Sequence, residues 1–222
     1  GITNISAAIL MWVVLKPVDY KPEQHKAIGH PGTSLSAYRD KKYLWFILFT
    51  MLFASCFFQL FTNLPVYLKN ELHFSKPFIG ILMAFNGILI AIVEMVLIYR
   101  LEGKRNILHY ITIGVFLVGL AFLILNIPGI GPLLAFAMIT TVTFGEILSM
   151  PFMNSYWITR THPSNRGQYA ALYTMAWSAA QTLGPMGGAQ LVEYSGFNLL
   201  WWSVGGLCII TSFSFLKLRN SS

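Results

Sequence analysis

The sequence predicts an all-α membrane protein, a bundle of six transmembrane helices, and three observations support this fold class. Charged residues make up 10% of the 222-residue chain, whereas soluble domains carry about 25%. Hydrophobic residues make up 55%, and the mean hydropathy is +0.61. Apolar stretches long enough to cross a bilayer, which takes about 20 residues, recur along the chain. These stretches are 43–68, 78–99, 106–126, 131–157, 168–192 and 197–216.

The connections between the spans are short and rich in Gly, Pro, Ser and Asn, so successive helices are expected to be antiparallel. Residues 1–15 are apolar but too short to cross a membrane, and we expect them to be the end of a preceding helix. Residues 16–42 are polar and contain three prolines, which predicts a cytoplasmic linker, with an interfacial helix as the alternative. The six-helix bundle then occupies 43–218, and 219–222 form a cytoplasmic tail.

The excess of basic residues indicates how the bundle is oriented. Fifteen Lys and Arg against eight Asp and Glu give a net charge of +7. Thirteen of the fifteen lie on one side of the predicted bundle, and Lys69 and Lys76 lie on the other. Because cytoplasmic loops retain Lys and Arg, we expect a multi-pass protein of the cell (inner) membrane with both ends of the bundle in the cytoplasm. This topology accounts for the charge without nucleic-acid binding.

Polar side chains within the spans predict which helices surround a cavity, because polar groups in hydrocarbon usually face a partner or a cavity. They are concentrated in the first, second, fourth and fifth spans, whereas the third and sixth are expected to face lipid. In the fifth span, aromatic residues and a glutamine recur every four residues, a pattern suited to amphipathic or cationic ligands. The alternative for each residue is helix packing or helix bridging. The substrate-binding candidates are Gln59, Asn63, Asn86, Thr143, Asn154, Tyr173, Trp177 and Gln181.

Two acidic residues lie within the hydrocarbon. Glu146 is near the middle of the fourth span, too deep for its side chain to reach water easily. An ionised carboxylate there needs a partner or a wet cavity, and otherwise it stays protonated, as a proton carrier requires. Glu94 is closer to the cytoplasmic face. We expect Glu146 to take part in proton coupling, with a hydrogen bond to a backbone carbonyl as the alternative. For Glu94 we expect first a structural ion pair with Arg100, Lys104 or Arg105, with proton coupling as the alternative.

The order of spans and several motifs resemble the C-terminal half of a major facilitator superfamily transporter, a fold with 3+3 inverted repeats. The loop after the second span, the start of the fifth span, the pair Gly145-Glu146 followed by Met150-Pro151, and the run 183–188 are each similar to a superfamily motif. The resemblance implies cytoplasmic loop-motif roles for Arg100, Glu102, Gly103, Lys104, Arg105, Arg166 and Gly167. It implies hinge or packing roles for Pro151, Gly184, Pro185, Gly187 and Gly188.

These observations predict a secondary active transporter that moves a small solute by alternating access with proton coupling, first of all an exporter of amphipathic compounds. A sugar or peptide symporter of the same fold is the alternative, as is a six-span solute-binding subunit of an energised importer. We expect no enzyme, since no hydrolase elbow is present, and neither cofactor nor metal. The expected partners are the lipid bilayer, the solute, protons and a missing N-terminal six-helix half of the same protein.

Overall fold

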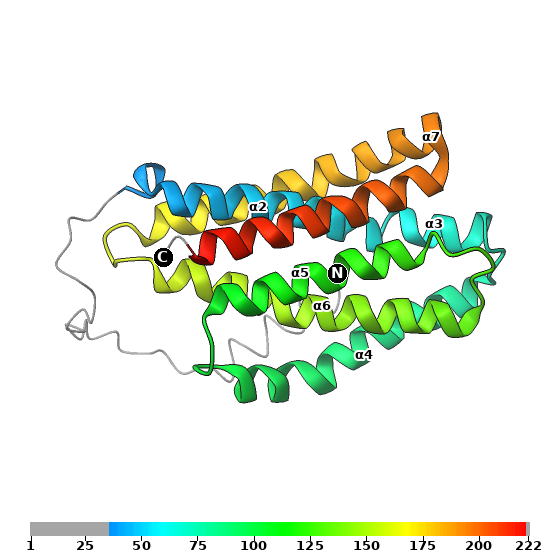
Figure 1. The fold of residues 1–222 in the computed structure, drawn as a ribbon, viewed down its shortest axis with the longest axis horizontal. Helices are drawn as coiled ribbons and strands as arrows, with labels where there is room; N and C mark the ends of the chain where they lie inside the picture. Colours follow the sequence, from blue (N-terminus) through cyan, green and yellow to red (C-terminus); the bar gives the residue numbers. More distant parts are fainter. Residues whose placement is uncertain (1–35, 221–222) are drawn as a thin grey trace, which may run out of the picture. The chain divides into compact units, whose positions relative to one another are not determined.

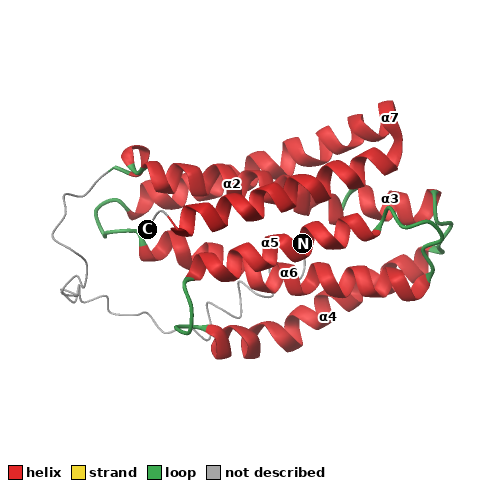
Figure 2. Cartoon of the chain, in the orientation of Figure 1, coloured by secondary structure: helices red, strands yellow, loops and turns green. Residues whose placement is uncertain are grey.

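The computed structural model describes residues 36–220 of the chain (Figure 1). The predicted helix end at 1–15 and most of the predicted linker 16–42 lie outside the described residues. Every regular element within 36–220 is helical (Figure 2). The predicted all-α fold class is therefore confirmed. The elements are η1 (Ala37–Arg39), α2 (Lys41–Phe57), η2 (Phe58–Leu60), α3 (Asn63–Asn70), α4 (Lys76–Leu101), α5 (Ile107–Ile124), α6 (Pro132–Thr159) and α7 (Arg166–Asn220).

Five helical stretches of the described chain are long and apolar enough to cross a membrane. The first, Lys41–Asn70, joins α2, η2 and α3, and α4, α5, α6 and α7 supply the others. With 55 residues, α7 is much longer than one crossing requires. It is two helices that meet at Gly196, where φ is 78° and ψ is 173°. The two arms, 166–195 and 197–220, run in opposite directions (Figure 1), so each of the six predicted spans corresponds to a helical segment.

The first span changes its helical geometry before its proline. The regular helix α2 ends at Phe57, a short 3₁₀ turn follows, and α3 begins at Asn63. Pro65 lies in the first turn of α3, where a missing backbone N–H costs no hydrogen bond. In the fourth span, by contrast, α6 continues through Pro151.

Helix α5 lies between α6 and α7, α2 packs on α7, and α4 packs mainly on α6. Small residues permit the closest approach: a Cβ on Gly114 of α5 would lie 2.6 Å from the Gly145 carbonyl oxygen of α6. The third span was expected to face lipid, but α5 is the most buried span, with half of its apolar window inside the bundle. The expectation was wrong because an apolar side chain packs as readily against a neighbouring helix as against lipid.

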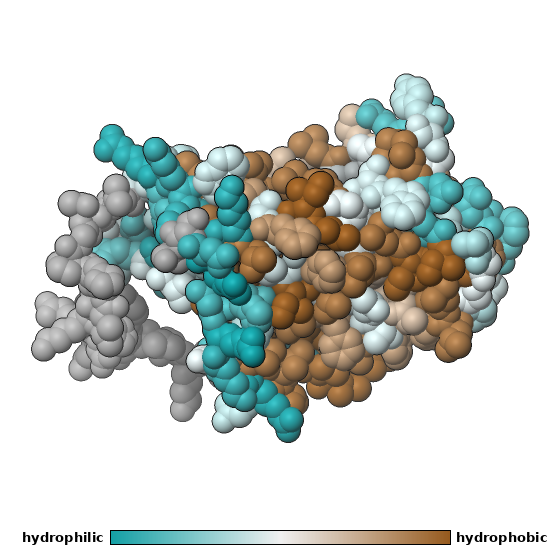
Figure 3. Space-filling view, viewed as in Figure 1, coloured by the Kyte–Doolittle hydropathy of each residue, from teal (hydrophilic) through white to brown (hydrophobic). Residues whose placement is uncertain are grey.

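The surface of the bundle is arranged as a membrane protein requires. In Figure 3 hydrophobic residues cover the middle of the helices, and hydrophilic residues gather toward both ends. Helix α4 contributes much of the apolar surface, because only Leu82 and Asn86 of its 26 residues are buried. Its other side chains are available to lipid or to another protein segment.

Candidate coupling and substrate site

The predicted coupling residue Glu146 lies where α4 meets α6. The Asn86 side chain on α4 is 5% exposed and donates from Nδ2 to Thr143 Oγ1 at 2.8 Å and to Glu146 Oε2 at 3.4 Å. Thr143 and Glu146 are three residues apart on α6, so both face the same side of that helix. The Thr143 hydroxyl also donates to the Ile139 carbonyl oxygen at 2.7 Å. A carboxylate, an amide and a hydroxyl thus meet in a half-buried spot between two membrane-spanning helices.

Glu94 belongs to the same part of the bundle. It lies eight residues after Asn86 on α4, on the same face, and within electrostatic range of Glu146. The ion pair expected for Glu94 with Arg100, Lys104 or Arg105 does not form among residues 36–220, so that expectation was wrong. No basic side chain in that part of the chain pairs with Glu146 either. The structure therefore places Glu146 at the α4–α6 contact, with Glu94 on α4 within electrostatic range of it.

The amides of the first span bridge two helices. Gln59 is 3% exposed, and its Nε2 donates to the Gly184 carbonyl oxygen of α7 at 2.7 Å. Asn63 donates from Nδ2 to Gln59 Oε1 at 2.5 Å and to the Pro185 carbonyl oxygen at 3.5 Å. Both side chains are thus committed to the backbone beside Pro185. Of the two roles weighed for Gln59 and Asn63, these contacts favour helix bridging over contact with a solute.

The glycines of the 183–188 run differ in their surroundings. A Cβ on Gly184 would lie 2.7 Å from the Ser55 carbonyl oxygen, and one on Gly188 would overlap the side chains of Gln59 and Asn63. Gly184 allows α2, and Gly188 allows η2 and α3, to approach α7 closely. A Cβ on Gly187 would meet nothing within 4 Å. Packing therefore explains Gly184 and Gly188, and it leaves Gly187 available for a hinge.

An aromatic series connects α6, α7 and η2. The rings of Trp157 and Tyr173 are 6.0 Å apart, those of Tyr173 and Trp177 are 6.3 Å apart, and Trp177 lies 6.0 Å from Phe58. Trp157 Nε1 donates to Asn154 Oδ1 at 2.8 Å, which joins another predicted residue to the series. The predicted stripe on α7 thus extends onto two other elements.

Trp157 and Phe58 were not among the predicted site residues. Trp157 is three residues after Asn154 on α6, and this helical spacing could have identified it. Gln181, the last residue of the predicted stripe, is exposed. No group of three or more His, Cys, Asp or Glu residues that could hold a metal ion occurs within 36–220.

A sequence model of the Major Facilitator Superfamily matches residues 1–185, most of the chain. The chain belongs to the Major Facilitator Superfamily. A relative described as an Na(+), Li(+), K(+)/H(+) antiporter of Planococcus maritimus is 24% identical over 192 residues. The match covers 80% of this chain and 45% of the relative, so the chain spans less than half of that protein's length. No solved structure matches the chain.

The loop between α4 and α5, which resembles a superfamily motif, is exposed. Gly103 has a φ of 75°, a left-handed conformation that allows the tight turn. Arg105 contacts His109 one turn into α5, with 3.1 Å between Nη1 and Nε2. Arg100, Glu102 and Lys104 are exposed and form no ion pair within the described chain. The corresponding residues at the start of α7, Arg166 and Gly167, are exposed as well.

An ion pair that the sequence analysis did not predict joins the beginning of α2 to the end of α6. Arg160, just after α6, donates to the Asp40 carboxylate at 2.6, 2.9 and 3.1 Å. Asp40 also caps α2 by accepting from the Tyr43 amide, and the Tyr169 hydroxyl of α7 donates to it at 3.0 Å. The Tyr43 hydroxyl in turn donates to the Tyr169 carbonyl oxygen at 2.6 Å. Three helix ends therefore converge on one carboxylate.

Asp40 is held in its ionised form. Burial by itself would raise the pKa of Asp40, but the hydrogen bonds and charge of Arg160, together with the bonds from Tyr43 and Tyr169, outweigh burial and lower the pKa below its usual value. Burial alone would lower the pKa of Arg160, whereas Asp40 raises it above its usual value. The pair therefore stays charged across the physiological pH range.

Proposed function

We propose that this chain is part of a secondary transporter that exchanges a cation for protons by alternating access across the cell (inner) membrane, with both ends of the bundle in the cytoplasm. The single observation that carries the proposal is the half-buried Glu146 carboxyl group, which lies beside Asn86 and forms no ion pair with a basic residue of the described chain. Glu94 lies within electrostatic range of it. A carboxyl group in such a place binds either a proton or another cation. Competition between the two for one site couples their movements in opposite directions.

For the transported cation we propose an alkali-metal ion. Hard cations prefer oxygen ligands, and this site offers the carboxylate of Glu146 and the hydroxyl oxygen of Thr143. The Planococcus maritimus relative is described as an antiporter of Na(+), Li(+) and K(+) against H(+). That description supports the proposal for this chain. The working transporter would include a second six-helix half, which the greater length of the relative supports.

The aromatic series supports a second candidate substrate, an amphipathic organic cation. Aromatic faces attract cations with an energy of about 0.5–2 kcal/mol per contact. Trp157, Tyr173 and Trp177 would offer such faces one after another between α6 and α7. No comparable observation supports a sugar or peptide symporter, and the proposal involves no enzymatic step.

The test is transport by the protein expressed from its complete gene and reconstituted in proteoliposomes. An imposed pH gradient should drive Na(+), Li(+) or K(+) uptake, and a cation gradient should drive proton movement. Glu146→Gln should abolish gradient-driven transport and weaken cation binding, because the cation and the proton lose the carboxylate for which they compete. Glu193→Gln, which changes an exposed carboxylate on α7, is the matched control and should transport normally. Full proton-driven activity of Glu146→Gln would overturn the proposal.

The same liposomes distinguish the two substrate classes. An organic dye cation, supplied in place of the alkali ions, should not move protons if the substrate is an alkali ion. Proton release that follows the dye and ignores Na(+), Li(+) and K(+) would favour the second candidate.

A further inference from the structure

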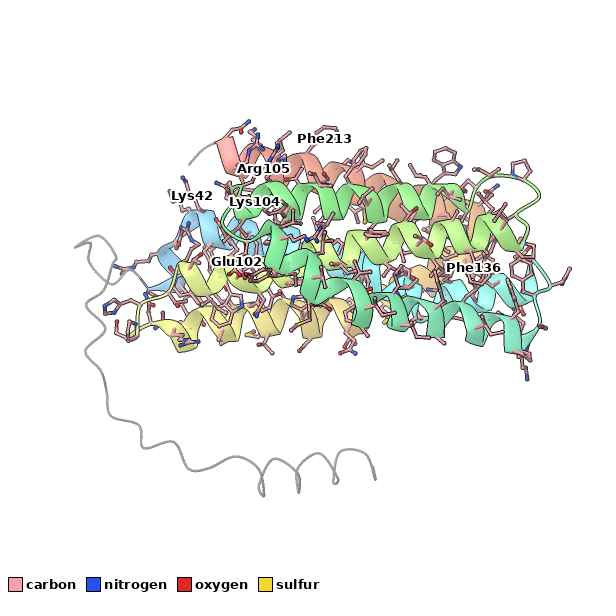
Figure 4. All side chains as sticks on the ribbon, turned by 90° about the horizontal axis from the view of Figure 1, so that it is seen from below. Lys42, Glu102, Lys104, Arg105, Phe136 and Phe213 are labelled. Atoms are coloured by element: carbon pink, nitrogen blue, oxygen red, sulfur yellow. The ribbon has the colours of Figure 1, made fainter. Side chains whose placement is uncertain are left out.

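The turns at one end of the bundle border a cavity of about 550 Å³ that is separate from the coupling site. Its lining comes from the end of α3, the α5–α6 turn and the turn of α7 at Gly196. Phe136, near the start of α6, lies toward this end of the bundle, far from Lys104 and Arg105 (Figure 4). In the proposed orientation this end faces away from the cytoplasm. We refer to this space as the turn cavity.

Part of the lining is aromatic and firmly held. The rings of Tyr67 and Phe197 line the turn cavity, with 5.3 Å between their centroids. Trp201, which is 1% exposed, packs on both, at 5.4 Å from Tyr67 and 6.2 Å from Phe197. The Tyr67 hydroxyl donates to the Leu125 carbonyl oxygen at 3.0 Å, which joins the end of α3 to the α5–α6 turn. The aromatic faces are therefore in place before a ligand arrives.

The polar lining of the turn cavity offers oxygen acceptors. Glu71, just after α3, is exposed, lies within electrostatic range of Tyr67 and forms no ion pair within residues 36–220. Asn126, in the α5–α6 turn, has a buried Oδ1 that accepts no hydrogen bond from the described residues. None of the described residues that line the cavity is basic. The turn cavity therefore combines a negative charge and an unsatisfied acceptor with an aromatic surface.

We propose that the turn cavity binds an organic ammonium ion, at a site distinct from Glu146 and additional to the proposed function. The ammonium group would pair with the Glu71 carboxylate. A rotation of the Asn126 amide would let it donate to Oδ1 as well, and a buried acceptor without a partner favours such a rotation. The apolar part of the ligand would lie against Tyr67 and Phe197, whose ring faces attract cations.

Other classes of ligand use less of the turn cavity. A bare alkali-metal ion would leave the aromatic rings unused, and a volume of about 550 Å³ lies in the range of sites for small organic molecules. An anion would meet the charge of Glu71 and no basic side chain of the described lining. An uncharged aromatic molecule would leave the Glu71 carboxylate unpaired. An ammonium ion with an apolar part satisfies both the acceptors and the rings.

Fluorine NMR with two matched probes tests the proposal on the protein expressed from its complete gene. The probes are para-fluorobenzylammonium and para-fluorobenzyl alcohol, which share a ring and differ in charge. The ammonium probe should bind more tightly, and Glu71→Gln should lower its affinity about ten-fold. Phe197→Leu, which removes an aromatic face, should lower it about three-fold. Glu193→Gln changes an exposed carboxylate near the same turn that does not line the cavity, and this matched control should keep the affinity.

Thermal unfolding in detergent checks that each variant folds, and the ammonium probe should raise the unfolding temperature of the wild type more than that of Glu71→Gln. Absence of binding, or equal affinity for the two probes, would overturn the proposal. A loss in Glu193→Gln as large as in Glu71→Gln would also overturn it, because surface charge in general would then attract the probe. Binding that is lost in Glu146→Gln but kept in Glu71→Gln would place the ammonium ion at the coupling site and reject the turn cavity. Since binding is measured without transport, a failure of the proposed function leaves this test intact.

Discussion

The Asp40 carboxylate and the Arg160 guanidinium form a two-pronged ion pair that joins the beginning of α2 to the end of α6 across 120 residues of sequence. Their side chains are 13% and 28% exposed, so the pair is largely sheltered from water. The Tyr169 hydroxyl adds a bond from α7. The helices that carry most of the predicted site residues are therefore held together at one end of the bundle.

Replacement of Arg160 by alanine should destabilise the protein by about 2–3 kcal/mol, because the sheltered charge of Asp40 loses its partner. Arg160→Lys should recover only part of this loss, since an ammonium group cannot form the two-pronged contact. Thermal or denaturant unfolding in detergent measures both changes. Arg100→Ala, at an exposed arginine of the same end, should change stability little. A loss for Arg160→Ala no larger than that for Arg100→Ala would refute the structural role.

The contribution of Asp40 should depend on pH. Because the pKa of Asp40 is lowered in the folded protein, its stabilisation is fully present above the ordinary pKa of an aspartate and is lost as pH falls through the lowered value. The wild type should therefore exceed Asp40→Asn in unfolding temperature by a constant amount near neutral pH. That advantage should shrink below about pH 4. An advantage that grows on acidification would contradict the assignment.

Substitutions at two glycines of α7 should distinguish a role in helix packing from a role as a hinge. Gly184→Ala should cost about 1–3 kcal/mol, because the new methyl group meets the backbone of Ser55. Gly187→Ala should leave stability unchanged or slightly raised, since its Cβ meets open space and alanine favours helix. Unfolding measurements on the pair check both expectations. Gly187→Leu then tests the hinge: we expect it to impair transport, and unchanged transport in a folded Gly187→Leu protein would end the hinge hypothesis.

The aromatic series should matter only if the substrate is an organic cation. In that case Trp157→Ala should raise the KM for a dye cation about ten-fold, the equivalent of ~1.4 kcal/mol of cation–π attraction. Trp202→Ala removes an indole of α7 that is 58% exposed and belongs to no part of the series, and it should not change KM. For an alkali cation neither change should affect KM. Initial rates in the reconstituted system measure both substrates.

The helices could be predicted from the sequence because each span is a property of its own residues. A run of about 20 apolar residues specifies a crossing whatever its neighbours are. Gly196 lies between two such runs, so the two arms of α7 were expected as separate spans. The choice of neighbours is different: nothing in the composition of α5 tells lipid from a protein neighbour, and α5 proved to be the most buried span.

Contacts between distant residues were beyond sequence reasoning. Asp40 lies in the predicted linker, and Arg160 was used in the sequence analysis only as one of the basic residues that indicate orientation. Their contact depends on the fold. Gln59 and Asn63 have the composition of a binding site, but their amides satisfy carbonyl groups of α7. Depth within a span, by contrast, is local information. It singled out Glu146, and the structure places Asn86 against it.

The turn at Gly196 also has a mechanical consequence. Because one residue reverses the chain between the two arms of α7, no slack separates them. Trp177 on the first arm is part of the aromatic series. On the second arm, the Ser212 hydroxyl donates to the Thr112 carbonyl oxygen of α5 at 2.8 Å. We therefore expect a displacement of the first arm along the membrane normal to pull or push on the second arm, which is hydrogen-bonded to α5.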